Sequence, residues 1–242
     1  MLPISIPAPA PPPVADEQWQ QYFDTNLRTC GLPEANRVVV IGAHPDDETI
    51  GAGRLLASLD IPAVALTLTA GEHCVECPDL GPAGVASVRL NEWRTALGRL
   101  GVRPLKAPTW PDGALADHID SAAAHIAKLL HPGDLVLAPW RHDPHPDHTA
   151  AGLAAADAVE YADAELVEYP VWAPYWRSPQ EVEELGWRFD AYPTDDEALA
   201  RWRQALLAYG SQLLPIKPGW PPVVPRDLFE RHPAQLIATR TS

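Results

Sequence analysis

The feature that most constrains the fold is an alternation of short apolar runs with longer segments of helical periodicity. Residues 37–43, 63–69 and 134–139 are apolar runs typical of strands covered on both faces, and 165–169 reads as a further strand. Residues 50–59, 85–100, 119–130, 149–161 and 199–209 place apolar or small side chains at helical spacing. The alternation predicts an α/β fold, a three-layer, Rossmann-like open sheet that is mostly parallel with helices on both faces.

Proline sets the expected domain boundaries. The 28 prolines among 242 residues are about twice the usual ~5% share, which favours long ordered loops and extended ends. We therefore expect a proline-rich arm over residues 1–18, one domain over 19–214 and a proline-rich tail over 215–242. Within the domain the periodicity fails at about 170–193, where Trp172, Tyr175 and Trp176 indicate an ordered aromatic-rich insertion.

Charge and composition exclude several classes of partner. Lys and Arg total 18 against 32 Asp and Glu, and the formal charge of −14 disfavours nucleic acid and anionic membranes. No apolar run approaches the ~20 residues that span a bilayer. Three cysteines are too few for a disulfide framework, and an odd number cannot all be paired within the chain. With no signal-peptide pattern at the start, we expect a cytoplasmic protein.

Two segments carry metal-binding side chains directly after predicted strands. His44 and Asp47 are three positions apart across a turn that opens a helix, so both side chains can point at one ion. His148 closes a second such loop, and the carboxyl ends of parallel strands meet at one edge of a sheet. Catalytic zinc usually takes three protein ligands, but two histidines and a carboxylate also accept Fe²⁺.

The remaining polar residues of these loops suit proton transfer. Asp46 is adjacent to a predicted ligand and can act as general base and acid toward a water whose pKa a metal lowers. His145 can stabilise an oxyanion, and Asp147 can orient His145 or His148. In the simpler alternative, Asp46 or Asp47 caps the helix and the two histidines lie in a solvated loop.

The paired motifs resemble a known family. Residues 43–48, Ala-His-Pro-Asp-Asp-Glu, together with 145–148, His-Pro-Asp-His, resemble the PIG-L (LmbE-like) metal-dependent deacetylases, which include mycothiol-pathway and antibiotic-pathway sugar deacetylases. The resemblance extends from about residue 38 to 212. It implies zinc held by His44, Asp47 and His148, with Asp46 as general base and His145 at the tetrahedral intermediate.

The resemblance also implies two substrate contacts. Arg89 begins an Arg-x-x-Glu pattern whose arginine reaches the sugar in the family, and Asp112 stands in a loop whose aspartate binds a sugar hydroxyl. Their alternatives are a surface salt bridge and an ordinary turn. Some members carry a tyrosine where this chain has Asp143, which removes any hydroxyl from that position.

These observations predict a hydrolase that removes an acyl group, most simply acetyl, from an N-acetylglucosamine-type sugar or glycosylated metabolite. The alternatives are an amidase of thiol conjugates, a sugar- or metal-binding protein without turnover, and ferrous redox chemistry. Cys74 and Cys77 have redox-dithiol spacing but favour a plain loop, since no second pair completes a zinc site. The Trp172 to Trp176 aromatics favour core packing over stacking on a sugar, and His142 favours a surface role.

Overall fold

The computed structural model describes residues 14–74, 80–215, 219, 221–230 and 234–241. Within those residues the centre of the molecule is a seven-stranded sheet with the order β3-β2-β1-β4-β5-β7-β6. The first five strands in this order are parallel, and β7 runs antiparallel to both of its neighbours. The predicted open, mostly parallel sheet is therefore confirmed. The strands are β1 (Arg37–Gly42), β2 (Ala63–Thr67), β3 (Arg103–Pro104), β4 (Asp134–Pro139), β5 (Glu165–Tyr169), β6 (Trp187–Tyr192) and β7 (Gln235–Arg240).

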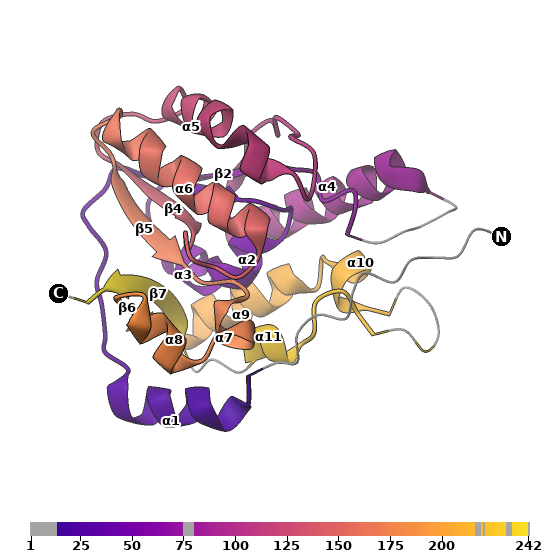
Figure 1. Ribbon diagram of the computed structural model, residues 1–242. Helices are drawn as coiled ribbons and strands as arrows, with labels where there is room; N and C mark the ends of the chain where they lie inside the picture. The colour runs from indigo at the N-terminus through magenta and orange to yellow at the C-terminus, as the bar shows by residue number, and fades with distance from the viewer. Residues whose placement is uncertain (1–13, 75–79, 216–218, 220, 231–233, 242) are drawn as a thin grey trace.

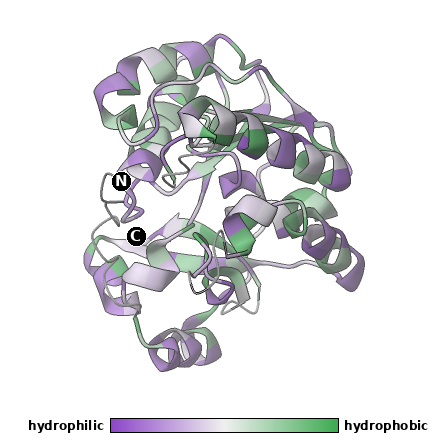
Figure 2. Cartoon of the chain, turned by 90° about the vertical axis from the view of Figure 1, so that its right-hand side faces the viewer, coloured by the Kyte–Doolittle hydropathy of each residue, from purple (hydrophilic) through white to green (hydrophobic). Residues whose placement is uncertain are grey.

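Helices cover both faces of the sheet because successive side chains of β1 point to opposite sides. Val38 and Val40 pack into a core with α3, α4 and α9, whereas Val39 and Ile41 pack into a second core with α5 and α6. Figure 1 shows α5 and α6 over one face and α3 and α9 over the other. In Figure 2 hydrophilic and hydrophobic stretches alternate along the helices, as amphipathic packing requires.

The helices have the following bounds: α1 (Asp16–Asn26), α2 (Asp47–Gly51), α3 (Gly53–Ser58), α4 (Gly81–Leu100), the 3₁₀ turn η1 (Leu115–His118), α5 (Ile119–Ala127), α6 (Pro146–Glu160), α7 (Ala173–Trp176), α8 (Pro179–Glu184), α9 (Asp196–Leu206), α10 (Gly210–Leu213) and α11 (Asp227–Glu230). Among the described residues no helix is both long and apolar enough to cross a membrane.

The helix expected over residues 50–59 is two helices, α2 and α3, that meet at Ala52. Glycines on both sides of this break permit close packing. A Cβ on Gly51 would lie 2.3 Å from the Tyr169 ring, and one on Gly53 would lie 2.5 Å from the Trp202 ring. The absence of a side chain at Gly51 and Gly53 therefore lets the chain after β1 pack closely between Tyr169 of β5 and Trp202 of α9.

The predicted tail over residues 215–242 needs correction, because β7 lies inside the sheet between β5 and β6. The aromatic-rich segment about 170–193 likewise ends in β6, the edge strand. Both strands pair with segments distant in the sequence, a constraint that local periodicity does not reveal. Residues 1–13 of the predicted arm lie outside the described part of the chain, and the other boundaries stay predictions.

The end of the sheet at β6 and β7 is covered by α1. The Trp19 ring stacks on Phe189 of β6 with centroids 5.4 Å apart, and Trp19 Nε1 donates to the carbonyl of Arg177 at 2.9 Å. Trp140, directly after β4, joins the same aromatic cluster. This cluster anchors the chain that leads from β4 toward the second histidine loop.

Candidate metal centre

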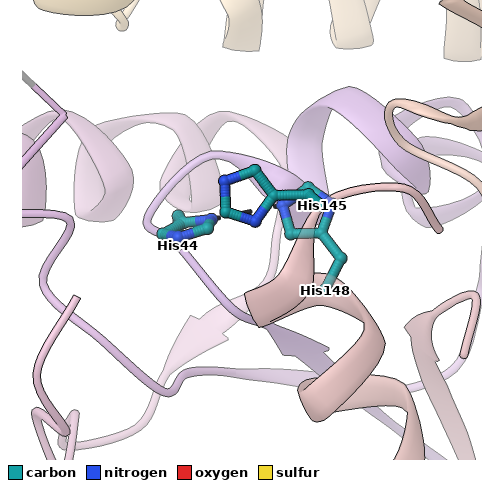
Figure 3. Close-up of side chains that lie close together, drawn as sticks. All are labelled: His44, His145 and His148. Atoms are coloured by element: carbon teal, nitrogen blue, oxygen red, sulfur yellow. Dashed lines mark hydrogen bonds between the residues drawn. The ribbon is translucent and has the colours of Figure 1, made fainter. Parts of the chain in front are cut away.

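The two histidine-rich loops meet at one edge of the sheet. β1 and β4 are adjacent and parallel, with Val40 opposite Leu137 in the register, so the loops that follow them emerge side by side. One loop leads from β1 into α2 and carries His44, and the other leads from β4 into α6. Figure 3 shows His44, His145 and His148 gathered where α6 begins.

The side chains of the three predicted ligands, His44, Asp47 and His148, form a small triangle. His44 Nδ1 lies 3.2 Å from His148 Nε2, and His148 Nε2 lies 3.1 Å from Asp47 Oδ1. His44 Nδ1 lies 3.6 Å from the other Asp47 oxygen, Oδ2. Zinc–nitrogen and zinc–oxygen bonds of about 2.0–2.2 Å place neighbouring tetrahedral ligands roughly 3.4 Å apart. The spacing and the chemistry of these donors therefore fit a divalent cation.

The backbone fixes the orientation of Asp47. Its Oδ2 accepts hydrogen bonds from the amides of Ala43 and His44 at 2.8 and 2.9 Å, which turns Oδ1 toward His148. Burial alone raises the pKa of this carboxyl, but the adjacent His148 and His44 bring it well below its usual range. Asp47 is thus held as an anionic donor.

The carboxylate of Asp147 lies against His44 rather than against the His145 or His148 ring, which corrects the predicted pairing. Its Oδ2 is 3.3 Å from His44 Nε2, and its carboxylate also accepts from the amides of Gly113 and Leu115 at 2.8 and 3.1 Å. The prediction placed the carboxylate by proximity in sequence, whereas the loop after β3 supplies the amides that turn it away. Asp147 can still orient a predicted ligand, but that ligand is His44.

Asp112 occupies the other side of the same imidazole. Its Oδ1 lies 3.1 Å from His44 Nε2, and its Oδ2 accepts from the amide of His73 at 2.8 Å. Burial raises the pKa of Asp112, but the hydrogen bond and charge of His44, the amide of His73 and the charge of Arg89 together outweigh burial and lower the pKa to about 2. The aspartate that the resemblance assigns to a sugar hydroxyl therefore contacts a predicted metal ligand in this structure.

Among the described residues, two overlapping groups bring ligand atoms within 4.8 Å of one another: His44 with His145 and His148, and His44 with Asp112 and Asp147. Both groups contain His44. In the second group backbone amides already hold both carboxylates. The first group contains His44 and His148, which form the triangle together with Asp47.

Asp46 is buried beside this triangle and pairs with Arg89. Arg89 Nη2 donates to Asp46 Oδ1 at 3.0 Å, and Arg89 Nη1 donates to the carbonyl of Gly71 at 3.0 Å. Burial raises the pKa of Asp46, although the Arg89 charge opposes the rise. Arg89 is only 3% exposed. Its buried side chain therefore contacts the predicted base and does not form the surface salt bridge of the alternative interpretation.

His145 caps the start of α6 with its own side chain. Its Nδ1 accepts from the amide of Asp147 at 3.2 Å, so the proton of the neutral ring is on Nε2. Burial, with the nearby charges of His148 and His44, lowers the pKa of His145 to about 3. The ring lies face to face with His148, at a centroid distance of 4.6 Å. His145 therefore offers a neutral hydrogen-bond donor beside the predicted ligands.

Sequence reasoning missed three acidic residues near the centre. Asp143 Oδ1 lies 3.1 Å from His148 Nδ1. Glu72 Oε1 accepts from the amide of Asp112 at 3.1 Å, and its place after β2 on the same sheet edge could have identified it. Glu48 is completely buried, and its carboxyl fills the space where a Cβ of Gly42 would lie 2.6 Å away. No pattern in the sequence marks that contact.

Other singled-out residues lie in varied surroundings. Trp172 and Trp176 stack on each other at 4.3 Å, and Trp172 and Tyr175 pack partly against the core. His142 lies edge-on to Trp140. Cys74 is half-buried and accepts from Gln212 Nε2 at 3.6 Å, whereas Cys77 lies outside the described residues. The roles of these groups stay predictions.

The fold and the site together define an α/β protein with a buried His/Asp cluster at the carboxyl edge of a parallel sheet. The family model described as PIG-L, GlcNAc-PI de-N-acetylase, matches residues 39–159. The chain belongs to the PIG-L family, as the paired motifs predicted.

Named relatives resemble this chain over different lengths. A 1D-myo-inositol 2-acetamido-2-deoxy-alpha-D-glucopyranoside deacetylase of Streptomyces avermitilis is 29% identical, over 72% of this chain and 68% of its own length. A diacetylchitobiose deacetylase of Thermococcus kodakarensis is 29% identical, over 53% of this chain and 51% of its own length. This chain thus spans about half of the second relative.

The fold also matches a solved structure. The crystal structure of a triple mutant of a deacetylase of the teicoplanin biosynthetic pathway superposes with a TM-score of 0.61 and 20% identity, covering 85% of this chain and 99% of that one. At that identity the match supports the fold alone.

Proposed function

We propose that this protein is a metal-dependent hydrolase that removes an acyl group, most simply acetyl, from the amine of an N-acetylglucosamine-type sugar or glycosylated metabolite. The observation that carries the proposal is the triangle of His44, Asp47 and His148 donor atoms, spaced 3.1–3.6 Å apart beside the buried Asp46. Membership of the PIG-L family and the names of the Streptomyces and Thermococcus relatives support the reaction class.

His44, Asp47 and His148 would hold the cation. When bound, a divalent metal supplies Lewis-acid chemistry, which lowers the pKa of a water and polarises a carbonyl. Zinc is our first choice for this donor set, and Fe²⁺ is a second because it accepts the same ligands. The burial of all three side chains restricts the exchange of water around them.

Asp46 is the proposed general base and acid. Arg89 holds one of its oxygens at 3.0 Å, which fixes the direction of the carboxylate. Burial raises the pKa of Asp46, which shifts it toward the range in which a carboxyl both takes and returns a proton near neutral pH. Asp46 would take a proton from the attacking water and give it to the departing amine.

His145 is the proposed donor to the developing oxyanion. Because its Nδ1 accepts from the Asp147 amide, its Nε2 carries the proton that such a donor needs. A preorganised neutral donor in a buried site costs no reorganisation when the charge develops. Removing one such donor typically costs about 10²–10³ in kcat.

The substrate class follows from the relatives and from charge. Both named relatives act, by their names, on compounds that contain an N-acetylated glucosamine unit. The net charge of −14 disfavours strongly anionic substrates. A neutral glycoside or glycosylated metabolite is therefore the proposed substrate, in preference to a sugar phosphate.

The test uses the full-length protein, stripped of metal and then loaded separately with Zn²⁺ or, without oxygen, with Fe²⁺. Mass spectrometry follows the release of free amine and acetate from N-acetylglucosaminides and from thiol-conjugate amides. We expect amine release from the glucosaminides. Release only from the thiol conjugates would favour the amidase alternative, and no release from either panel would contradict the proposal.

A variant separates catalysis from simple binding. Asp46→Asn should keep bound metal but lose most hydrolysis, by about 10²–10⁴-fold if it removes the general base. Asp60→Asn, at an exposed position, is the matched control and should retain full activity. Equal hydrolysis by the Asp46 variant and the wild type would argue against the assigned role.

A further inference from the structure

The carboxylate of Asp143 lies between the second histidine loop and the segment that leads into α7. We propose that Asp143 is a positioning residue of the metal centre: it holds His148 with Nε2 turned to His44 and Asp47, and it ties this loop to residues 171–173. The inference deepens the proposed function and rests on it for the role of His148. No motif assigned this role to Asp143.

One oxygen of Asp143 serves the histidine loop. Oδ1 lies 3.1 Å from His148 Nδ1 and accepts from the amide of His145 at 3.2 Å. Both the Asp143 and His148 side chains are almost completely buried, at 0% and 1% exposure. Water therefore does not compete for this contact.

The contact decides which nitrogen of His148 carries the proton. A carboxylate oxygen only accepts, so Nδ1 must donate, and the Nε2 lone pair is left for an ion. Nε2 is the atom that lies 3.2 Å from His44 Nδ1 and 3.1 Å from Asp47 Oδ1. Such carboxylate partners fix the tautomer and ring orientation of metal-binding histidines.

The second oxygen of Asp143 serves a different part of the chain. Oδ2 accepts from three consecutive backbone amides, those of Val171, Trp172 and Ala173, at 2.9–3.0 Å. Val171 and Trp172 follow β5, and Ala173 is the first residue of α7. The Trp172 ring stacks on that of Trp176, the last residue of α7. The position of the aromatic segment and that of His148 are thus set by one carboxylate.

This arrangement couples metal binding at His148 to the opening of the 171–173 backbone. An ion that holds His148 in place also holds Asp143 Oδ1, and therefore the same carboxylate that accepts from the 171–173 amides. Linkage is reciprocal, so metal binding should slow opening of the 171–173 backbone and loosening of that backbone should weaken metal binding. A purely structural anchor of the 171–173 segment would not predict this dependence on metal.

Asp143→Asn is the direct test, because an amide cannot satisfy both sets of donors. If the amide oxygen faces residues 171–173, its NH₂ faces His148 Nδ1 and favours the tautomer with the proton on Nε2. If the amide oxygen faces His148, the NH₂ group faces the three backbone N–H donors of residues 171–173, which then lose their acceptor. We expect the Zn²⁺ dissociation constant, measured by competition with a chromophoric chelator, to rise by about 10–100-fold.

Asp134→Asn is the matched control. Asp134 lies at the start of β4, whereas Asp143 follows the end of that strand. Asp134 pairs with Arg37 at the edge of the sheet opposite to His44 and His148. This variant should unfold at a lower temperature but keep the wild-type Zn²⁺ affinity. A folded Asp143→Asn protein whose Zn²⁺ affinity is within twofold of the wild type would overturn the proposal.

Hydrogen exchange supplies a second readout. In the wild type, Zn²⁺ should slow exchange of the peptide that contains residues 171–173, and in Asp143→Asn this protection should vanish. Identical metal-dependent protection in both proteins would contradict the link.

The wild-type protein tests the tautomer even if the variant does not fold. Long-range ¹H–¹⁵N NMR of the Zn²⁺-loaded protein, with His148 assigned by comparison with His148→Gln, should show the proton on Nδ1. A proton on Nε2 would overturn the proposal. If the wild type binds no Zn²⁺ at all, the proposed function is refuted. If the wild type binds Zn²⁺ tightly and Asp143→Asn binds it equally well, only the role of Asp143 is refuted.

Discussion

Arg89 Nη2 and Asp46 Oδ1 form a buried ion pair at 3.0 Å, with side-chain exposures of 4% and 5%. The pair joins the middle of α4 to the turn after β1 and so connects the longest described helix to the proposed base. Removing one member of a buried pair leaves an uncompensated charge, which is more costly than losing an exposed pair.

Arg89→Met should therefore reduce stability by about 3–5 kcal/mol and reduce hydrolysis by at least about tenfold, because Asp46 loses the group that orients it. Denaturant unfolding and initial rates measure the two effects. Arg94→Met, at an exposed position on the same helix, is the control and should change neither quantity much. A fully active Arg89→Met protein would show that the pair does not support Asp46.

Gly71→Ala tests the Arg89–Asp46 pair through the backbone that packs against the guanidinium. Gly71 has φ of +62°, and a Cβ there would lie 1.8 Å from Arg89 Nη1. The substitution should displace the guanidinium and lower both stability and activity, since strain in the left-handed region adds roughly 1 kcal/mol to the clash. Thermal unfolding and initial rates provide the measurements.

Gly98→Ala is the matched glycine control on α4. Among the described residues, no atom outside the neighbouring backbone of the helix lies within 4 Å of a Cβ placed there. Alanine is favoured over glycine in a helix by roughly 0.5–1 kcal/mol. The melting temperature should stay the same or rise. If both glycine variants behaved alike, the predicted contact between residue 71 and Arg89 would be wrong.

The ion pair of Arg37 and Asp134 predicts a pH dependence of stability away from the metal centre. Burial raises the pKa of Asp134, but hydrogen bonds from Arg37 and from the His131 amide outweigh it, so the folded pKa lies below the ordinary value. The unfolded chain then takes up the proton first, and the contribution of Asp134 is lost as the pH falls below about 4. Urea unfolding of the wild type and Asp134→Asn should differ most at neutral pH and converge in acid; a difference that grew in acid would contradict this sign.

Gln235 connects the C-terminal strand to the helices after β1. Its Nε2 donates to the carbonyl of Gly51 at 2.5 Å, and its Oε1 accepts from the amide of Leu55 at 3.2 Å. Gln235→Leu should cost about 1–3 kcal/mol because both buried backbone groups lose their partner. Gln204→Leu, at an exposed position, should be close to neutral in the same unfolding assay, and equal losses would show that Gln235 is not a specific bridge.

Local patterns predicted the central strands well because burial on both faces leaves a continuous apolar run. The strands expected at 134–139 and 165–169 coincide with β4 and β5. β7 was missed because its place depends on pairing with β5 and β6, and because prolines precede it. The paired motifs predicted which loops meet, since parallel topology alone brings them to one edge.

Side-chain direction was less predictable. Asp147 and Asp143 are both close to His148 in sequence, yet Asp143 contacts it and Asp147 faces His44. The difference arises from backbone amides at residues 113, 115 and 171–173, which belong to loops whose shape no periodicity encodes. The resemblance assigns Arg89 to the substrate, whereas in the structure its guanidinium donates to Asp46. The cytoplasmic location stays a prediction.

The anomalous difference density of a crystal of the Zn²⁺-loaded protein, recorded on both sides of the zinc absorption edge, locates the bound ion. We expect one zinc-specific peak about 2.0–2.2 Å from His44 Nδ1, an Asp47 carboxylate oxygen and His148 Nε2. Full zinc occupancy at another set of residues, with none among these three, would contradict this expectation.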